Sequence, residues 1–214
     1  MDTHLADLRK EYTQRSLDRS EVLPDPIPQF ERWFAEAEAA QVPEPNAMHL
    51  ATVSPDGQPS SRIVLLKGVE DNHFVFYSNY ASRKGQNMSH QPRVSLTFFW
   101  PELERQVRIE GQVTQISDER STAYFHSRPR GSQLGAWVSP QSEVIADRAV
   151  LTQRQRELEA KFADQEIPRP DHWGGYAVQP YTVEFWQGRP SRLHDRLRYQ
   201  RQPDNSWVIE RLAP

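Results

Sequence analysis

The feature that most restricts the fold of this chain is a series of short strand-like segments between residues 47 and 116. In the last of them Val107, Ile109 and Val113 alternate with polar residues, a period of two that predicts a strand with one face in water. Pro55-Asp56-Gly57 is a hairpin signal. The sequence predicts strands at 48–53, 61–68, 73–78, 93–100 and 105–116, and again at 178–187, 193–200 and 207–211.

Helical patterns are fewer, and they do not alternate regularly with the strands. They predict helices over 3–19, 30–40, 118–127 and 143–163, and a short helix that opens at 82–85. Because a doubly wound parallel sheet needs regular alternation, the pattern favours a mainly β (α+β) fold, a barrel or sandwich decorated with helices. A length of 214 residues suits one well-buried domain and is short for two.

Several classes of function are excluded by what the sequence lacks. There is no Cys, which removes disulfides, thiolate zinc sites and a Cys nucleophile, and the seven His never pair at metal-ligand spacing, so we expect no metal. Neither G-x-G-x-x-G nor a Walker loop occurs. The net charge of −3 argues against a nucleic-acid partner. With no signal peptide and no run of about 20 apolar residues, we expect a cytoplasmic protein without a membrane partner.

Residues 192–196, Arg-Leu-His-Asp-Arg, form one of several cationic clusters. On a strand, Arg192, His194 and Arg196 would share one face at a spacing of about 7 Å. Such groups repel one another unless solvent or an anion compensates their charge. The cluster therefore indicates either an anion pocket or an exposed edge strand, and the nearby Trp186 favours the pocket.

A second cluster combines a phenol, guanidinium groups and a hydroxyl. Tyr124 and Arg128 would share a helix face at i, i+4, while Arg130 and Ser132 follow Pro129, where a loop could fold back. Converging donors with positive charge are what a phosphate dianion needs. The alternative is a helix end with solvated arginines.

Two of the four Lys lie beside apolar strands, in Arg62-Ile63-Val64-Leu65-Leu66-Lys67 and in Ser82-Arg83-Lys84-Gly85. The first Lys could simply extend to the surface. The second opens a short helix, where free backbone N–H groups favour an anion. Together the clusters predict two separate phosphate sites.

Six stretches then fit one known pattern, without large gaps between them: RIVLLK (62–67), FYSNYASRKG (76–85), LERQVRIEG (103–111), YFHSRPRGSQLGAWVSPQS (124–142), WGGY (173–176) and EFWQGRPSRLHDR (184–196). In these the chain resembles the pyridoxine/pyridoxamine 5′-phosphate oxidase family of FMN-binding split barrels. The resemblance implies a split β-barrel and an obligate homodimer, with FMN at the subunit interface. It also implies a helical segment at 1–20 that folds over the site, and a single domain over 21–214.

The resemblance assigns roles residue by residue. FMN would be bound by Arg62, Ile63, Val64, Leu65, Leu66, Lys67, Tyr77, Ser78, Arg83, Lys84, Gln106, Gln141, Ser142, Trp186 and Arg196. The substrate would contact Arg9, Lys10, Glu11, Tyr12, Lys67, Tyr124, Arg128, Ser132, Arg192, Leu193 and His194. Arg192 and His194 would be catalytic. Flanking arginines favour a neutral His194, which suits a proton acceptor.

The implied reaction is FMN-dependent oxidation of pyridoxamine and pyridoxine 5′-phosphates to pyridoxal 5′-phosphate. Dioxygen is the acceptor, hydrogen peroxide is released, and the amine substrate also gives ammonia. Two alternatives stay open: a related FMN oxidase of another aromatic substrate, of the phenazine-precursor type, and a non-catalytic flavin- or haem-binding module.

Overall fold

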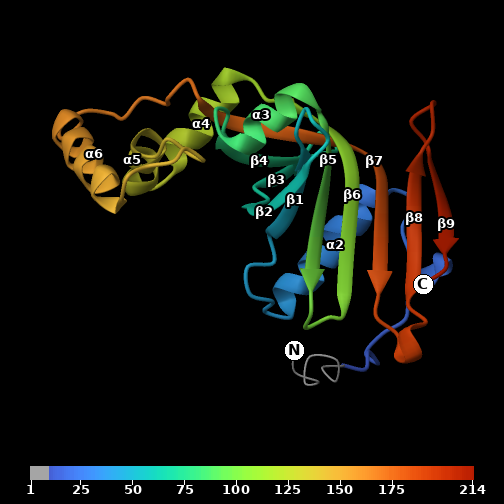
Figure 1. Ribbon diagram of the computed structural model, residues 1–214. Coiled ribbons are helices and arrows are strands. Elements are labelled where there is room, and N and C mark those ends of the chain that lie inside the picture. The colour runs from blue at the N-terminus through green and yellow to red at the C-terminus, as the bar shows by residue number, and fades with distance from the viewer. Residues whose placement is uncertain (1–9) are drawn as a thin grey trace. The chain divides into compact units, whose positions relative to one another are not determined.

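The computed structural model describes residues 10–214 (Figure 1). The strands are β1 Ala47–Val53, β2 Pro59–Leu65, β3 Gly68–Glu70, β4 His73–Asn79, β5 Arg93–Trp100, β6 Arg105–Gln115, β7 Trp173–Gln187, β8 Asp195–Arg201 and β9 Trp207–Leu212. The helices are α2 Pro26–Ala39, α3 Arg83–His90, α4 Asp118–Ser127, α5 Arg130–Val138 and α6 Arg148–Lys161, with short 3-10 turns at Arg19–Glu21 and Pro190–Arg192. The predicted fold class, mainly β with helices, is confirmed.

The strands are hydrogen-bonded in the order β2-β1-β5-β6-β7-β4-β3, and β8 joins β7 to β9. The pairs β3–β4, β4–β7, β7–β8 and β8–β9 are all antiparallel. The register of β4 with β7 sets Tyr77 opposite Gly175, and that of β7 with β8 sets Trp186 opposite Arg196. Segments distant in sequence are thereby brought together.

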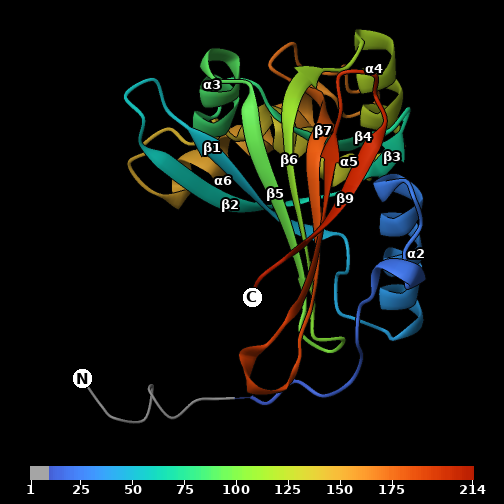
Figure 2. The ribbon, with the colours of Figure 1, turned by 90° about the vertical axis from the view of Figure 1, so that its right-hand side faces the viewer.

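The described chain divides into two compact units. The first contains the residues up to Leu50, with 95–111 and 180–214, and the second contains 51–94 and 112–179. In the first unit, α2 covers the strands (Figure 2), with Phe30 5.1 Å from Phe98 and Trp33 5.1 Å from Phe185 between ring centroids. The second unit has its own cluster of buried residues, Phe125, Leu134, Phe162, Ile167 and Trp173.

Helix α2 begins four residues earlier than the pattern predicts. Asp25 caps it by accepting a hydrogen bond from the Ile27 amide at 2.8 Å. Pro26 and Pro28 lie in the first turn, where a helix leaves its N–H groups unpaired and proline is therefore tolerated. The proline-rich segment starts this helix instead of breaking it.

Other predictions of local structure are also wrong. Residues 10–18 form no helix, and residues 3–9 of the helix predicted over 3–19 lie outside the described residues. The residues after Pro129 form α5 instead of a loop. Strand β8 begins only at Asp195, so positions 192–194 do not alternate as a strand would.

No helix in the described part of the chain is long and apolar enough to cross a membrane. Among residues 10–214 there is also no group of three or more His, Asp or Glu side chains that could hold a metal ion.

Candidate functional site

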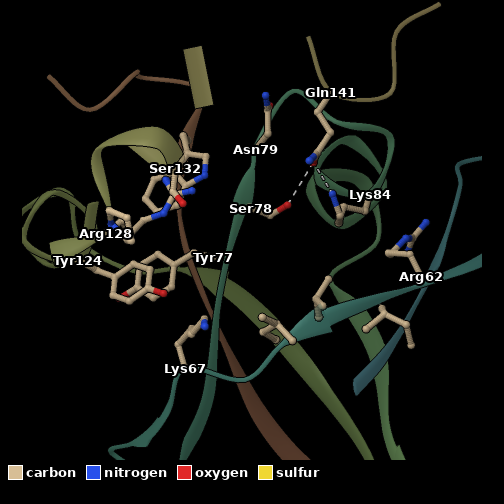
Figure 3. A pocket seen from close by; sticks show the side chains of 15 residues that line it. Arg62, Lys67, Tyr77, Ser78, Asn79, Lys84, Tyr124, Arg128, Ser132 and Gln141 are labelled. Carbon is tan, nitrogen blue, oxygen red and sulfur yellow. Dashed lines mark hydrogen bonds between the residues drawn. The ribbon is translucent and has the colours of Figure 1, made fainter. Parts of the chain in front are cut away.

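A pocket of about 610 Å³ lies in the second unit (Figure 3). Most of its lining residues are predicted site residues: Arg62, Ile63, Val64, Leu65, Lys67, Tyr77, Ser78, Lys84, Tyr124, Arg128, Ser132 and Gln141. Asn79, Pro129 and Trp173 complete the lining and were not predicted. Figure 3 shows two groups of side chains, one around Lys84 and Gln141 and one around Tyr124 and Arg128.

Helix α3 places Lys84 in this pocket. Ser82 caps the helix by accepting a hydrogen bond from the Gly85 amide at 3.3 Å. At Gly85 the helix approaches the preceding turn so closely that a Cβ would lie 2.1 Å from the Tyr80 carbonyl oxygen. Only glycine fits there, because the obstacle is backbone.

Gly85→Ala is expected to destabilise the protein by about 3 kcal/mol, at the upper end of overpacking costs, because neither backbone segment can yield. For a chain of this size the midpoint of thermal unfolding should fall by roughly 6–12 °C. Gly131→Ala in α5 is the matched control, since a Cβ there meets nothing within 4 Å. Equal unfolding midpoints for the two variants would contradict the packing argument.

Lys84 is a buried cation with polar partners only. Its Nζ donates to Gln141 Oε1 at 2.6 Å and to Ser82 Oγ at 3.1 Å, and Ser78 Oγ also donates to Gln141 at 3.4 Å. Burial, and then the charge of Arg62, lowers the pKa of Lys84 to about 8. A nearby anion would supply the missing counter-charge.

Arg62 adds a second cation on the same side of the pocket. Its guanidinium donates to Thr52 Oγ1 and to Ser60 Oγ, both at 2.8 Å, which fixes its orientation. Burial, and then the charge of Arg83, lowers the pKa of Arg62. Arg62 and Lys84 thus concentrate positive charge without a carboxylate among the pocket's lining residues.

The other group is an aromatic stack with a guanidinium on it. The Tyr77 and Tyr124 rings are 3.8 Å apart at 18°, and Trp173 is nearly parallel to both. Arg128 lies over Trp173, 4.4 Å from the ring centroid. One Nη atom of Arg128 is buried without a hydrogen-bond partner. Burial lowers the pKa of the Arg128 guanidinium. A buried unpaired donor costs free energy, so this site suits an added anion.

A second pocket, of about 720 Å³, lies in the first unit. It is lined by Lys10, Glu11, Tyr12, Arg189, Ser191, Arg192 and His194, of which Arg189 and Ser191 were not predicted. Ser191 and Arg192 have φ of 54° and 61°, the left-handed region that non-glycine residues rarely adopt. Such strain is typical of functional loops.

The hydrogen bond of His194 fixes its tautomer. The Arg189 amide donates to His194 Nδ1 at 3.1 Å, so Nδ1 carries no proton and the neutral ring carries its proton on Nε2. Partial burial, and then the charge of Arg192, lowers the pKa of His194. Neutral His194 is therefore a hydrogen-bond donor through Nε2, which differs from the proton acceptor that the sequence suggested.

The remaining predicted residues lie outside both pocket linings. Trp186 packs beside Tyr12 and His194, with ring centroids 5.7 and 4.6 Å away. Arg196 is held by Glu184 in a bidentate pair at 2.9 and 3.0 Å. Leu66 is buried, Gln106 is half-buried, Arg83, Ser142 and Leu193 are exposed, and Arg9 lies outside the described residues.

Comparison with known proteins agrees with these features. Residues 34–162 match the family model "Pyridoxamine 5'-phosphate oxidase", and residues 173–214 match "Pyridoxine 5'-phosphate oxidase C-terminal dimerisation region". A pyridoxine/pyridoxamine 5′-phosphate oxidase of Acaryochloris marina is 59% identical over 99% of this chain and 96% of its own. The protein of that name from Cupriavidus necator is 56% identical over 99% of this chain and 100% of its own.

Solved structures give the same fold. PhzG from Burkholderia lata, solved in complex with tetrahydrophenazine-1-carboxylic acid, has a TM-score of 0.88 and 31% identity, covering 96% of this chain and 100% of its own. An FMN-binding protein of Nostoc punctiforme has a TM-score of 0.70 at 19% identity, covering 94% and 100%, and supports the fold alone. The predicted split-barrel fold is confirmed, and this chain belongs to the pyridoxamine 5′-phosphate oxidase family.

Proposed function

We propose that this chain is an FMN-dependent oxidase that converts pyridoxamine 5′-phosphate and pyridoxine 5′-phosphate to pyridoxal 5′-phosphate. The observation that carries the proposal is the buried, unpaired Nη of Arg128 over the aromatic stack, in a pocket that also holds the separate Lys84 group. Two cationic groups in one pocket suit a phosphorylated cofactor and a phosphorylated substrate. Relatives that match nearly the whole chain and are named pyridoxine/pyridoxamine 5′-phosphate oxidase support the same function.

The FMN phosphate is assigned to the group around Lys84. Arg62 and Lys84 supply charge, while Ser78 and Gln141 supply directed polar groups beside them. When bound, FMN would supply the hydride acceptor for the substrate, with dioxygen as the final electron acceptor. We propose a homodimer with FMN at the subunit interface, because the C-terminal part of the chain matches a dimerisation region.

The substrate phosphate is assigned to the Arg128 group. Tyr124, Ser132 and Lys67 line the pocket with Arg128 and offer hydroxyl and ammonium donors. Trp173, which stacks with Tyr77 and Tyr124, holds the Arg128 guanidinium in place through cation–π contact. Because its position is already fixed, little side-chain entropy is lost when the phosphate binds.

Arg192 and His194 are assigned to the reacting end of the substrate. Neutral His194 donates from Nε2 to the substrate amine or alcohol and orients it. Arg192 positions the ring and stabilises negative charge that develops during oxidation. We propose that residues of the N-terminal segment, including Tyr12, cover this pocket, which they line.

The direct test is to purify the protein, record its flavin spectrum, and add pyridoxine 5′-phosphate under air. We expect a yellow protein that produces the aldehyde and peroxide in equal amounts. A colourless protein that takes up no FMN would contradict the proposal.

A phenazine-type oxidase is the second candidate, and the similarity to PhzG favours including its substrates in the test. A substrate panel separates the two, because only a pyridoxine/pyridoxamine 5′-phosphate oxidase should have a much higher kcat/KM for a substrate that carries a 5′-phosphate. Preference for an unphosphorylated tricyclic substrate would assign the chain to the second activity.

FMN binding is expected to weaken as the pH rises above about 8. Lys84 binds the phosphate in its charged form, and in the free protein its pKa is about 8. FMN phosphate is already a dianion above its second pKa of about 6. The affinity should therefore be level near pH 7 and fall by up to about tenfold per pH unit above 8. Fluorescence titration measures it, and Lys84→Arg, whose charge persists, should remove the decline.

A further inference from the structure

One buried carboxylate binds the backbone of the segment 10–14, while the Gln14 side chain donates to the Glu102 carbonyl at 2.9 Å. Glu104 lies in the turn between β5 and β6, and its side chain is only 2% exposed. Its Oε2 accepts hydrogen bonds from the Thr13 amide at 2.9 Å and the Gln14 amide at 3.1 Å. Lys10 adds a longer ionic contact, at 3.8 Å from Oε1.

The backbone of Glu104 binds a different segment. Its carbonyl accepts from the Gly188 amide at 2.7 Å and from Gln187 Nε2 at 3.2 Å, at the end of β7. Its φ of 54° is left-handed, which turns the carbonyl and the side chain toward separate partners. Glu104 thus joins the N-terminal segment to the start of the loop that carries Arg192 and His194.

Tyr12 lies between these two attachments. Its ring meets Trp186 edge-on at 5.7 Å and His194 at 5.9 Å. A Cβ at Gly188 would lie 2.7 Å from Tyr12 Cγ, so the missing side chain of Gly188 provides the space that Tyr12 occupies. The position of Tyr12 therefore depends on the hydrogen bond that the amide of the next residue, Thr13, donates to Glu104.

We infer that Glu104 is a positioning residue for substrate binding: its carboxylate fixes Thr13 and Gln14, and thereby holds Tyr12 against the wall of the second pocket beside His194. The assignment of a substrate to this pocket rests on the proposed function, but the attachment itself does not. Other contacts hold the segment farther along, such as Arg189 Nη1 to the Arg15 carbonyl at 3.1 Å and the Leu17 amide to Asp195 at 3.1 Å. Loss of the Glu104 carboxylate should therefore free Tyr12 without detaching the whole segment.

Hydrogen exchange in the FMN-loaded enzyme tests the attachment. Glu104→Ala should raise the exchange rate of the Thr13 and Gln14 amides at least about tenfold, because a hydrogen-bonded amide exchanges only on local opening. Glu104→Gln should largely restore protection, since its Oε1 can still accept. Glu102→Ala is the control, because it removes the same charge from the same turn. Glu102 binds the segment only through its backbone carbonyl, which accepts from Gln14 Nε2 and remains in the variant. Unchanged exchange in Glu104→Ala would overturn the inference.

Kinetics test the consequence for the substrate. Glu104→Ala and Tyr12→Ala should each raise KM for pyridoxine 5′-phosphate about tenfold with FMN affinity unchanged, and the double variant should resemble Tyr12→Ala alone. Additive effects would mean that Glu104 does not act through Tyr12. If Glu104→Ala does not fold, Gly188→Ala takes its place, because a side chain at Gly188 displaces Tyr12 directly. It should give the same KM increase, and an unchanged KM in Gly188→Ala would also overturn the inference. If the wild type oxidises no such substrate, the proposed function fails while the exchange result still decides the role of Glu104.

Discussion

Arg128→Ala is expected to lower kcat/KM for pyridoxine 5′-phosphate by about 100-fold or more, and to leave kcat/KM for unphosphorylated pyridoxine within about twofold. Truncating one partner of a buried charge pair costs about 2–5 kcal/mol, and 1.4 kcal/mol is a factor of ten. Arg128 is a strong candidate for such a pair because its buried Nη has no partner and its guanidinium is fixed over Trp173.

The two substrates make the experiment a thermodynamic cycle, since only one of them offers the phosphate. Arg156→Ala on α6 is a suitable control, because it removes the same charge from an exposed helix position. The flavin spectrum should be the same in all three proteins, since the FMN phosphate is assigned to the Lys84 group. A parallel loss for both substrates would show that Arg128 supports the pocket wall instead of binding phosphate.

Much of this fold could be predicted because its signals are local. Helix α4 has the predicted bounds, since Ser117 caps its first turn through the Arg120 amide. The alternating residues of β6 bury one face as predicted. The residue types that gather in the first pocket could also be picked out from the sequence, because several clusters of Arg, Lys and hydroxyl groups in one chain together suit the binding of anions.

Some of the errors lie where contacts between distant segments decide the conformation. The helical spacing of Leu5, Leu8 and Tyr12 predicts a helix, but Thr13 and Gln14 donate to Glu104, about ninety residues away. A strand was expected from residue 193, yet the left-handed residues Ser191 and Arg192 precede it and β8 begins only at Asp195. No local pattern of non-glycine residues predicts that conformation.

Contacts between distant segments also explain the features of the site that the sequence did not reveal. Trp173 contributes through a ring stack, and Arg189 contributes its amide to His194, so neither role can be read from residue type. Arg196 is paired with Glu184 on the neighbouring strand β7, a contact that the sequence did not reveal, and its FMN contact stays a prediction. That pairing depends on the register of β7 with β8.

The role of His194 leads to the second large effect. Its Nδ1 accepts from the Arg189 amide, so neutral His194 can donate from Nε2 but has no free lone pair for a substrate proton. Removing a donor of this kind typically costs about 100- to 1000-fold in turnover. We therefore expect His194→Ala to lower kcat by about 100-fold while the protein keeps its FMN.

The variant His194→Gln distinguishes between two roles of His194, hydrogen-bond donor and general base. A Gln amide can donate from Nε2 but cannot take up a proton, so it should recover about tenfold of the lost kcat if donation is the function.

The pH dependence of kcat gives a second test of the role of His194. Because the pKa of His194 is lowered, the neutral form prevails at neutral pH. Protonation of Nδ1 removes the acceptor for the Arg189 amide and with it the orientation of the ring, so kcat should fall as the pH drops below the usual His range near 6.5. This acid limb should vanish in His194→Gln. If His194→Gln is as slow as His194→Ala, the imidazole acts as a base and the Arg189 hydrogen bond must break during turnover.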